Sequence, residues 1–256
     1  MAEGKAQRYL TTGPLTRRAE DLFPLLKIMA GPDGLDMGAE EVIELGRPED
    51  VSLEGLRVVV VKGNGLRRVS KELQRSQEKV AKVLESLGAT VVRREIKGLK
   101  KSLDIWSNLM TAASDTPFKT ILADGQEIAL GRELVNWARR KSPYTLPAIA
   151  LARIETIPVF APGDPSLAYA AARKLKTEIE DIIGSRGIML YPSYTRAAPR
   201  HALPIATPFD WVYTAIFNTL ELPATQIPTG LSKEGLPLGI QVVGTHGSDH
   251  LTIAVA

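Results

Sequence analysis

Apolar and polar positions alternate along residues 56–95 in a way that predicts one strand–helix–strand unit. The run Val58–Val61 is apolar and β-branched, which is typical of a buried strand. Val69–Leu87 carries apolar residues at helical spacing, so we expect an amphipathic helix that ends at Gly88. Thr90–Val92 has the composition of a second strand. A unit of this length predicts a parallel crossover.

The rest of the chain shows weaker periodic segments. Its predicted helices are 9–31, 148–154, 166–183 and 213–220, and its predicted strands are 188–192, 224–227 and 238–243. In the first helix, Leu22, Leu25, Leu26 and Met29 share one side, and Arg17 should face Asp21 one turn later. The Gly-Pro-Asp-Gly turn at 31–34 is expected to end it.

Apolar residues at helical spacing occur twice more, and the longest helix has an apolar stripe as well. Their spacing favours contacts with a core over contacts with a cofactor. The two groups between 97 and 144 are Trp106, Leu109 and Met110, and Leu134, Val135, Trp137 and Ala138. The residues expected to point inward from the helix at 166–183 are Leu167, Ala171, Leu175, Ile179 and Ile182.

The bulk composition is that of a globular chain with a sizeable core: 256 residues, 44% of them hydrophobic. The formal net charge is only +3, which gives no electrostatic reason to expect nucleic acid as a partner. Four basic clusters are interpreted as scattered, solvated surface: Arg67-Arg68, Arg93-Arg94, Lys100-Lys101 and Arg139-Arg140-Lys141.

Several classes of protein and site are disfavoured. Without cysteine there is no disulfide, thiolate metal site or cysteine nucleophile, which fits a reducing, intracellular location. No apolar run approaches the roughly 20 residues that span a bilayer, and residues 1–13 lack the apolar core of a signal peptide. Any membrane association is therefore expected in parts outside this chain. Its abrupt ends, including the uncapped apolar stretch 252–256, are interpreted as cut points.

Common motifs for metal, nucleotide and hydrolase sites are absent as well. His246 and His250 are four residues apart but form no HExxH pair, so we expect no metal, and Gly63-Asn64-Gly65 lacks the third glycine of a dinucleotide loop. No GxSxG nucleophile elbow occurs. The sequence predicts neither a metal site nor a cofactor.

The stretch 207–244 is punctuated by prolines and glycines, and here the order of residues becomes specific. It reads Phe217-Asn218, Leu222-Pro223-Ala224, Pro228, Gly230, Gly235-Leu236-Pro237-Leu238-Gly239 and Gln241. This pattern resembles the C-terminal part of the amidase signature hydrolases, and within them the fatty-acid amide hydrolases, particularly the type 2 enzymes. Gly13-Pro14-Leu15-Thr16-Arg17 and Leu190-Tyr191-Pro192-Ser193 resemble the same family.

The resemblance implies an α/β fold, the C-terminal portion of the amidase signature fold, with a mixed sheet flanked by helices on both faces. Residues 1–256 would form a partial amidase domain without its N-terminal catalytic part. Such enzymes use a Ser–cis-Ser–Lys arrangement beside a glycine- and serine-rich stretch that this sequence lacks. We therefore assign no catalytic residue and expect the chain alone to be inactive on its small-molecule amide substrate.

The same resemblance suggests where substrate would be contacted. Trp211, Thr214, Ala215 and Ile216 align with residues that line the acyl-chain channel, and Phe217 and Asn218 align with an aromatic–Asn pair that supports the site. Ordinary core packing of a sheet-covering helix is an equally open interpretation of these six residues. Glu221 stands where many members of the family have glycine, which puts the local turn in question.

Two other functions remain as alternatives. The chain could be a non-catalytic relative that binds an apolar ligand or a partner protein. An aminoacyl-tRNA amidotransferase component of the same family is disfavoured, because the sequence shows no marked basic face for tRNA. The sequence assigns no oligomeric state.

Overall fold

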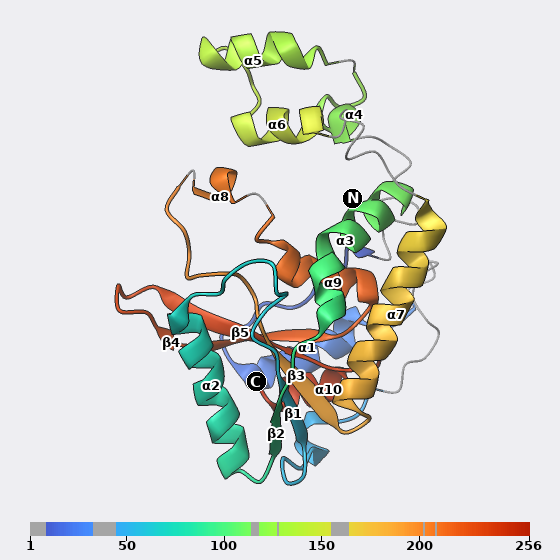
Figure 1. The fold of residues 1–256 in the computed structure, drawn as a ribbon, viewed down its shortest axis with the longest axis vertical. Helices are drawn as coiled ribbons and strands as arrows, with labels where there is room; N and C mark the ends of the chain where they lie inside the picture. The colour runs from blue at the N-terminus through green and yellow to red at the C-terminus, as the bar shows by residue number, and fades with distance from the viewer. Residues whose placement is uncertain are drawn as a thin grey trace.

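The computed structural model describes residues 9–32, 45–113, 118–126, 128–154, 164–201, 203–207 and 209–256. In these residues, five strands form one mixed sheet in the order β2-β1-β3-β5-β4 (Figure 1). The strands are β1 (Arg57–Val60), β2 (Thr90–Arg93), β3 (Gly187–Pro192), β4 (Ala224–Leu231) and β5 (Pro237–Val243). β1 is parallel to β2 and β3, whereas β5 is antiparallel to β3 and β4.

Helices cover both faces of this sheet, as predicted. One face packs against α2 (Lys71–Ser86) and α10 (Asp249–Ala254), and the other against α3 (Ser102–Ala113), α7 (Pro165–Ile183) and α9 (Val212–Leu220). The alternation of side chains along each strand explains the two cores. Val58 and Val60 lie in the first core, and Val59 and Val61 in the second.

The parallel crossover predicted for residues 56–95 is confirmed. β1 and β2 are parallel neighbours in the sheet, and α2 connects them along the chain. Ser70 caps the helix, since its Oγ accepts a hydrogen bond from the Leu73 N–H at 3.4 Å. Gly88, with φ +92°, lies in the left-handed region just after the helix, where glycine is favoured.

The remaining helices are shorter and more peripheral. They are α1 (Leu22–Met29), α4 (Phe118–Leu122), α5 (Leu130–Ala138), α6 (Leu146–Ile154) and α8 (Leu203–Ala206), with 3₁₀ turns at Ala19–Asp21, Pro48–Asp50 and Lys97–Lys101. Among them α6 contacts both α4 and α5, and the three lie together beyond one end of the sheet (Figure 1). None of the helices in the described ranges is long and apolar enough to cross a membrane.

The predicted helix over 9–31 is wrong at its beginning. The α-helix starts only at Leu22, after a 3₁₀ turn, so Arg17 lies outside it and cannot face Asp21 across a helical turn. Arg18, at φ −130°, is extended, and the Thr16 hydroxyl donates to its carbonyl at 2.7 Å, which stabilises a turn there. The turn predicted at 31–34 falls partly outside the described residues.

The predicted apolar stripe of α5 does not face a core as expected, and that of α7 does so except at its first residue. α5 buries no residue, and Leu134, Val135 and Trp137 are 49%, 49% and 41% exposed. On α7, Leu175 and Ile179 are buried as predicted, but Leu167 is 69% exposed. Periodicity identifies an apolar face, whereas burial depends on what lies opposite that face. The group at Trp106, Leu109 and Met110 does pack on the core.

The strand predicted at 224–227 continues through Pro228 to Leu231. Proline was expected to end it, because proline cannot donate to a ladder. β4 is an edge strand in the described sheet, so the missing donor costs no inter-strand bond on the open side. The register with β5 shifts between Pro228 and Gly230, which accommodates the proline.

Gly187, the first residue of β3, tests how tightly the sheet is packed. A Cβ there would lie 3.0 Å from the Arg57 carbonyl oxygen and closer still to that of Ile183. We expect Gly187→Ala to lower the free energy of unfolding by about 1–3 kcal/mol, the usual cost of overpacking. Gly131→Ala in α5, where a Cβ meets nothing within 4 Å, should instead be neutral or stabilise by about 0.5 kcal/mol. Urea unfolding of both variants measures the contrast, and equal effects would contradict it.

Candidate functional site

The six residues predicted to contact substrate lie in or beside α9, but they divide between two sides of it. Ile216 and Phe217 are fully buried in the core beneath the helix. Trp211 and Ala215 are half-buried, while Thr214 and Asn218 are exposed. Trp211, Thr214, Ala215 and Asn218 are separated by three or four residues and so share the outer side of the helix. Only this group can face a ligand without a change in packing.

Trp211, which precedes the first turn of α9, is held by an aromatic contact. Its ring meets that of Trp106 on α3 edge to face, with centroids 4.4 Å apart and an interplanar angle of 71°. Edge-to-face pairs at this distance are favourable beyond the area they bury. The two indoles therefore form a fixed apolar surface where α3 and α9 pack together.

Directly before Trp211 lies a buried carboxylate that the sequence analysis did not identify. Asp210 has no exposed surface, and its side chain accepts hydrogen bonds from Thr195 Oγ1 at 2.7 Å and Arg67 Nε at 3.0 Å. Arg196 Nη2 lies 3.7 Å from the same carboxylate. Because a buried charge is stable only when paired, these contacts fix Asp210 in place. The signal in the sequence was one acidic residue within the apolar stretch Phe209–Tyr213.

Tyr213 adds a second link from α9 to the loop after β1. Its hydroxyl bonds to Asn64 Oδ1 at 3.0 Å and to the Arg67 carbonyl at 3.1 Å. Asn64 Oδ1 also accepts from the backbone N–H groups of Leu66 and Arg67, closing a turn within that loop. The loop 61–70 leads from β1 into α2, which agrees with its interpretation as a crossover connection.

Burial raises the pKa of the Tyr213 phenol, and the nearby Asp210 carboxylate raises it further. The pKa of Tyr191 lies well above its ordinary value, first because the ring is buried and then because of Tyr213. The two rings stack with centroids 5.4 Å apart, and Tyr191 meets Phe217 edge to face at 5.2 Å. Both phenols stay neutral at physiological pH, and their rings pack in the core.

Three serines in the described part of the chain make structural hydrogen bonds. Ser70 caps α2, the Ser76 hydroxyl donates to Thr229, and that of Ser193 donates to Gln226. None of these bonds involves a lysine, so in the described part of the chain they do not form a serine–lysine nucleophile. The described residues also contain no group of three or more side chains of the His, Cys, Asp or Glu type that could hold a metal. His246 Nδ1 instead lies 3.1 Å from the Glu221 carbonyl.

Two hollows of about 450 and 440 Å³ occur on the described surface, away from α9. The first lies on α2 and the second lies beside α10. Neither is lined by residues 211–218.

The bond between Thr195 and Asp210 yields a direct test. Thr195→Val keeps the side-chain shape but removes a donor to a buried carboxylate, which should cost about 1.5–3 kcal/mol of unfolding free energy. Thr195→Ser, which keeps the hydroxyl, should recover most of that loss. Thr214→Val is the matched control, because Thr214 is exposed and bonds only to the Trp211 carbonyl of its own helix. Thermal unfolding that ranks Thr214→Val as equally damaging would rule out a structural role for the buried bond.

Comparison of the sequence with known proteins identifies relatives of this chain. The chain is 37% identical over its whole length to human fatty-acid amide hydrolase 2, and 39% identical to fatty-acid amide hydrolase 2-A of Danio rerio. It covers 49% and 48% of those proteins, so it spans about half the length of the curated relatives it matches.

Solved structures show the same fold. A bacterial aryl acylamidase of the amidase signature family superposes with a TM-score of 0.65 at 19% identity, over 94% of this chain and 51% of that one. The family described as Amidase matches residues 2–253. The chain therefore belongs to the amidase signature family, whose members are hydrolases of carbon–nitrogen bonds.

Proposed function

We propose that this chain is the substrate-channel half of an enzyme that hydrolyses fatty-acid amides. The observation that carries the proposal is the 37–39% identity to fatty-acid amide hydrolases along the entire chain. The complete enzyme would use the Ser–cis-Ser–Lys mechanism implied by the family resemblance, with those three residues outside the present sequence. The chain by itself would then show no turnover.

The outer side of α9 is the candidate wall for the acyl chain. Trp211 and Ala215 offer apolar surface there, and the Trp106–Trp211 contact holds the indole in position. Burying a methylene group yields about 0.8 kcal/mol, so the affinity for an acyl chain would rise about fourfold with each additional carbon buried against such a wall. Ile216 and Phe217 would support the wall from the core and would not contact substrate.

Fluorophosphonate labelling tests whether the catalytic serine lies outside this chain. These probes react with activated serine nucleophiles, so this chain alone should remain unlabelled and turn over no fatty-acid amide. The complete protein should be labelled and should hydrolyse the same substrate. Labelling of the isolated chain would overturn the assignment of the catalytic residues to another part. An unlabelled complete protein would favour a non-catalytic relative that binds an apolar ligand.

Trp211→Leu in the complete protein tests the channel wall. We expect kcat/KM for a long-chain amide to fall at least fivefold, with a much smaller change for a short-chain amide, because only the long chain reaches the indole. Tyr169→Leu on α7 is the matched control, since Tyr169 is 40% exposed and lies on another helix. An equal fall for both chain lengths would assign Trp211 to the support of the fold and not to substrate contact.

A further inference from the structure

Positive charge is concentrated in one segment of this nearly neutral chain. Residues 57–101 contain 13 of the 32 Lys and Arg residues but only four of the 29 Asp and Glu residues. The rest of the chain holds 19 basic and 25 acidic residues, so it is net acidic. The overall charge of +3 therefore conceals a strong separation of charge.

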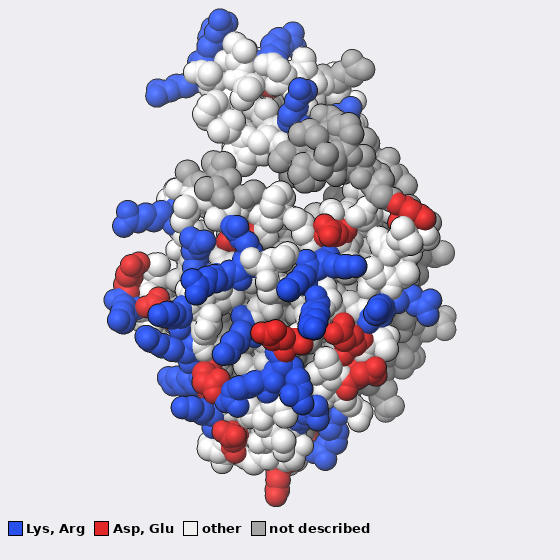
Figure 2. Space-filling model, in the orientation of Figure 1, with Lys and Arg blue, Asp and Glu red and all other residues white. Residues whose placement is uncertain are grey.

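Three of the four basic clusters that looked scattered in the sequence, at 67–68, 93–94 and 100–101, lie within this segment. All Lys and Arg residues of segment 62–101 are exposed, and we refer to them as the basic face. Arg93 on β2 is hydrogen-bonded to Glu78 on α2, and Lys100 lies against Gly65 of the loop after β1. Figure 2 shows Lys and Arg side chains crowded over the region of α2 and β2, with few acidic ones between them.

A stripe of four cations runs along the solvent side of α2. Lys71, Arg75, Lys79 and Lys82 follow each other at spacings of four, four and three residues, which places them on one side of the helix. Within the described part of the chain they form no ion pair. Three glutamates, Glu72, Glu78 and Glu85, lie on the same helix. Of these, Glu78 is bonded to Arg93, and this bond above all holds its pKa below the ordinary value. With 13 basic and four acidic residues in segment 57–101, its positive charge is only partly neutralised within the segment.

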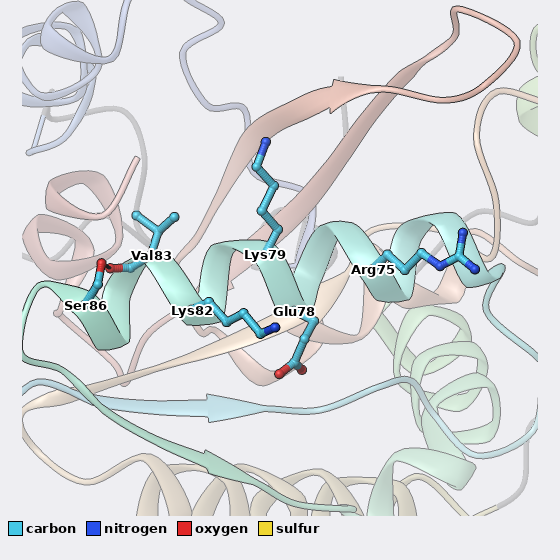
Figure 3. A pocket seen from close by; sticks show the side chains of 6 residues that line it. All are labelled: Arg75, Glu78, Lys79, Lys82, Val83 and Ser86. Atoms are coloured by element: carbon cyan, nitrogen blue, oxygen red, sulfur yellow. Dashed lines mark hydrogen bonds between the residues drawn. The ribbon is translucent and has the colours of Figure 1, made fainter.

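Three cations of the stripe, Arg75, Lys79 and Lys82, line a shallow hollow of about 450 Å³, shown in Figure 3. In Figure 3, Lys79 and Val83 project upward from the near side of the helix, Glu78 projects downward, and Lys82 lies across the front of the helix between them. Apolar side chains stand exposed beside these cations: Val83 is 51% exposed, Leu87 54%, and Leu66, on the loop before α2, 60%. Cations interspersed with exposed aliphatic groups suit a surface that offers both phosphate groups and hydrocarbon.

We propose that the basic face is a docking surface for an anionic phospholipid bilayer. A 16-residue helix is about 24 Å long, so the stripe can contact many lipid headgroups at once. Nucleic acid is the weaker match, because segment 57–101 contains no Phe, Trp or Tyr on which a base could stack. The proposal does not depend on the substrate or on catalytic activity, and it differs from the expectation that membrane association lies only outside this chain.

Vesicle co-sedimentation of the 256-residue chain tests the proposal. Binding to phosphatidylserine-containing vesicles should exceed binding to pure phosphatidylcholine vesicles, and the excess should disappear near 1 M salt, where the screening length falls to about 3 Å. Each cation near such a surface strengthens binding by about fivefold. The double variant Lys79→Gln/Lys82→Gln should therefore bind phosphatidylserine vesicles at least tenfold more weakly, with unchanged binding to phosphatidylcholine.

Arg173→Gln/Lys174→Gln is the matched control, because it removes the same charge from exposed positions on α7. It should retain most of the binding, and circular dichroism should show both variants folded. An equal loss in the control would mean that net charge alone drives binding and would overturn the proposal. Unchanged vesicle binding by Lys79→Gln/Lys82→Gln would also overturn the proposal. If this variant lost binding to double-stranded RNA but kept its binding to vesicles, the basic face would be a nucleic-acid surface instead.

Discussion

The structure depends on the complete burial of β3. All six residues of this strand are buried, its edges pair with β1 on one side and β5 on the other, and helices cover both of its faces. The backbone polar groups of a buried strand must be paired, and here side chains add to the ladder, since Gln77 donates to the Leu190 carbonyl and Gln241 to that of Pro192. Gly187 allows the close approach of Ile183 at its start, and Pro192 ends the strand where the loop to Thr195 begins. The mixed character of the sheet follows from β3, which joins the parallel pairs to the antiparallel ones.

The carboxyl ends of β1 and β3 carry the loops that fix α9. Asp210 receives hydrogen bonds from Arg67, 143 residues earlier in the chain, and from Thr195, 15 residues earlier. Tyr213 bonds to the same loop after β1, and Gln241 of β5 donates to the carbonyl groups of Pro192 and Tyr213, both at 3.1 Å. The position of Trp211 is therefore set by a polar network between sheet and helix, and not only by apolar packing. A buried network of this kind fixes one arrangement, because breaking any bond leaves an unpaired polar group.

The sequence was informative where the local pattern and the tertiary environment agree. The β-branched run at 58–61, the amphipathic helix that follows it and the apolar run at 238–243 all predicted their elements to within a residue or two. It was uninformative about the burial of α1 and α5, neither of which buries a residue completely, because an apolar face does not specify what covers it. It could not reveal the contacts of Asp210 either, since they join segments with no local relation. Glu221 shows an intermediate case: the doubt about its turn was justified, since it adopts φ +53°, where glycine is usual.

The six predicted substrate residues also show how far a family resemblance reaches. These residues lie in or beside α9, where successive side chains point alternately to the core and to the surface, and motif similarity does not distinguish the two sides. Ile216, which has no exposed surface, contributes to the same core as Met189 of β3 and Ile179 of α7, so a smaller side chain there leaves a cavity. Loss of activity on changing Ile216 would then accompany loss of stability and would say nothing about substrate. Trp211 is held from outside by Trp106, so an effect there that depends on the length of the acyl chain and leaves stability unchanged would report on the channel itself.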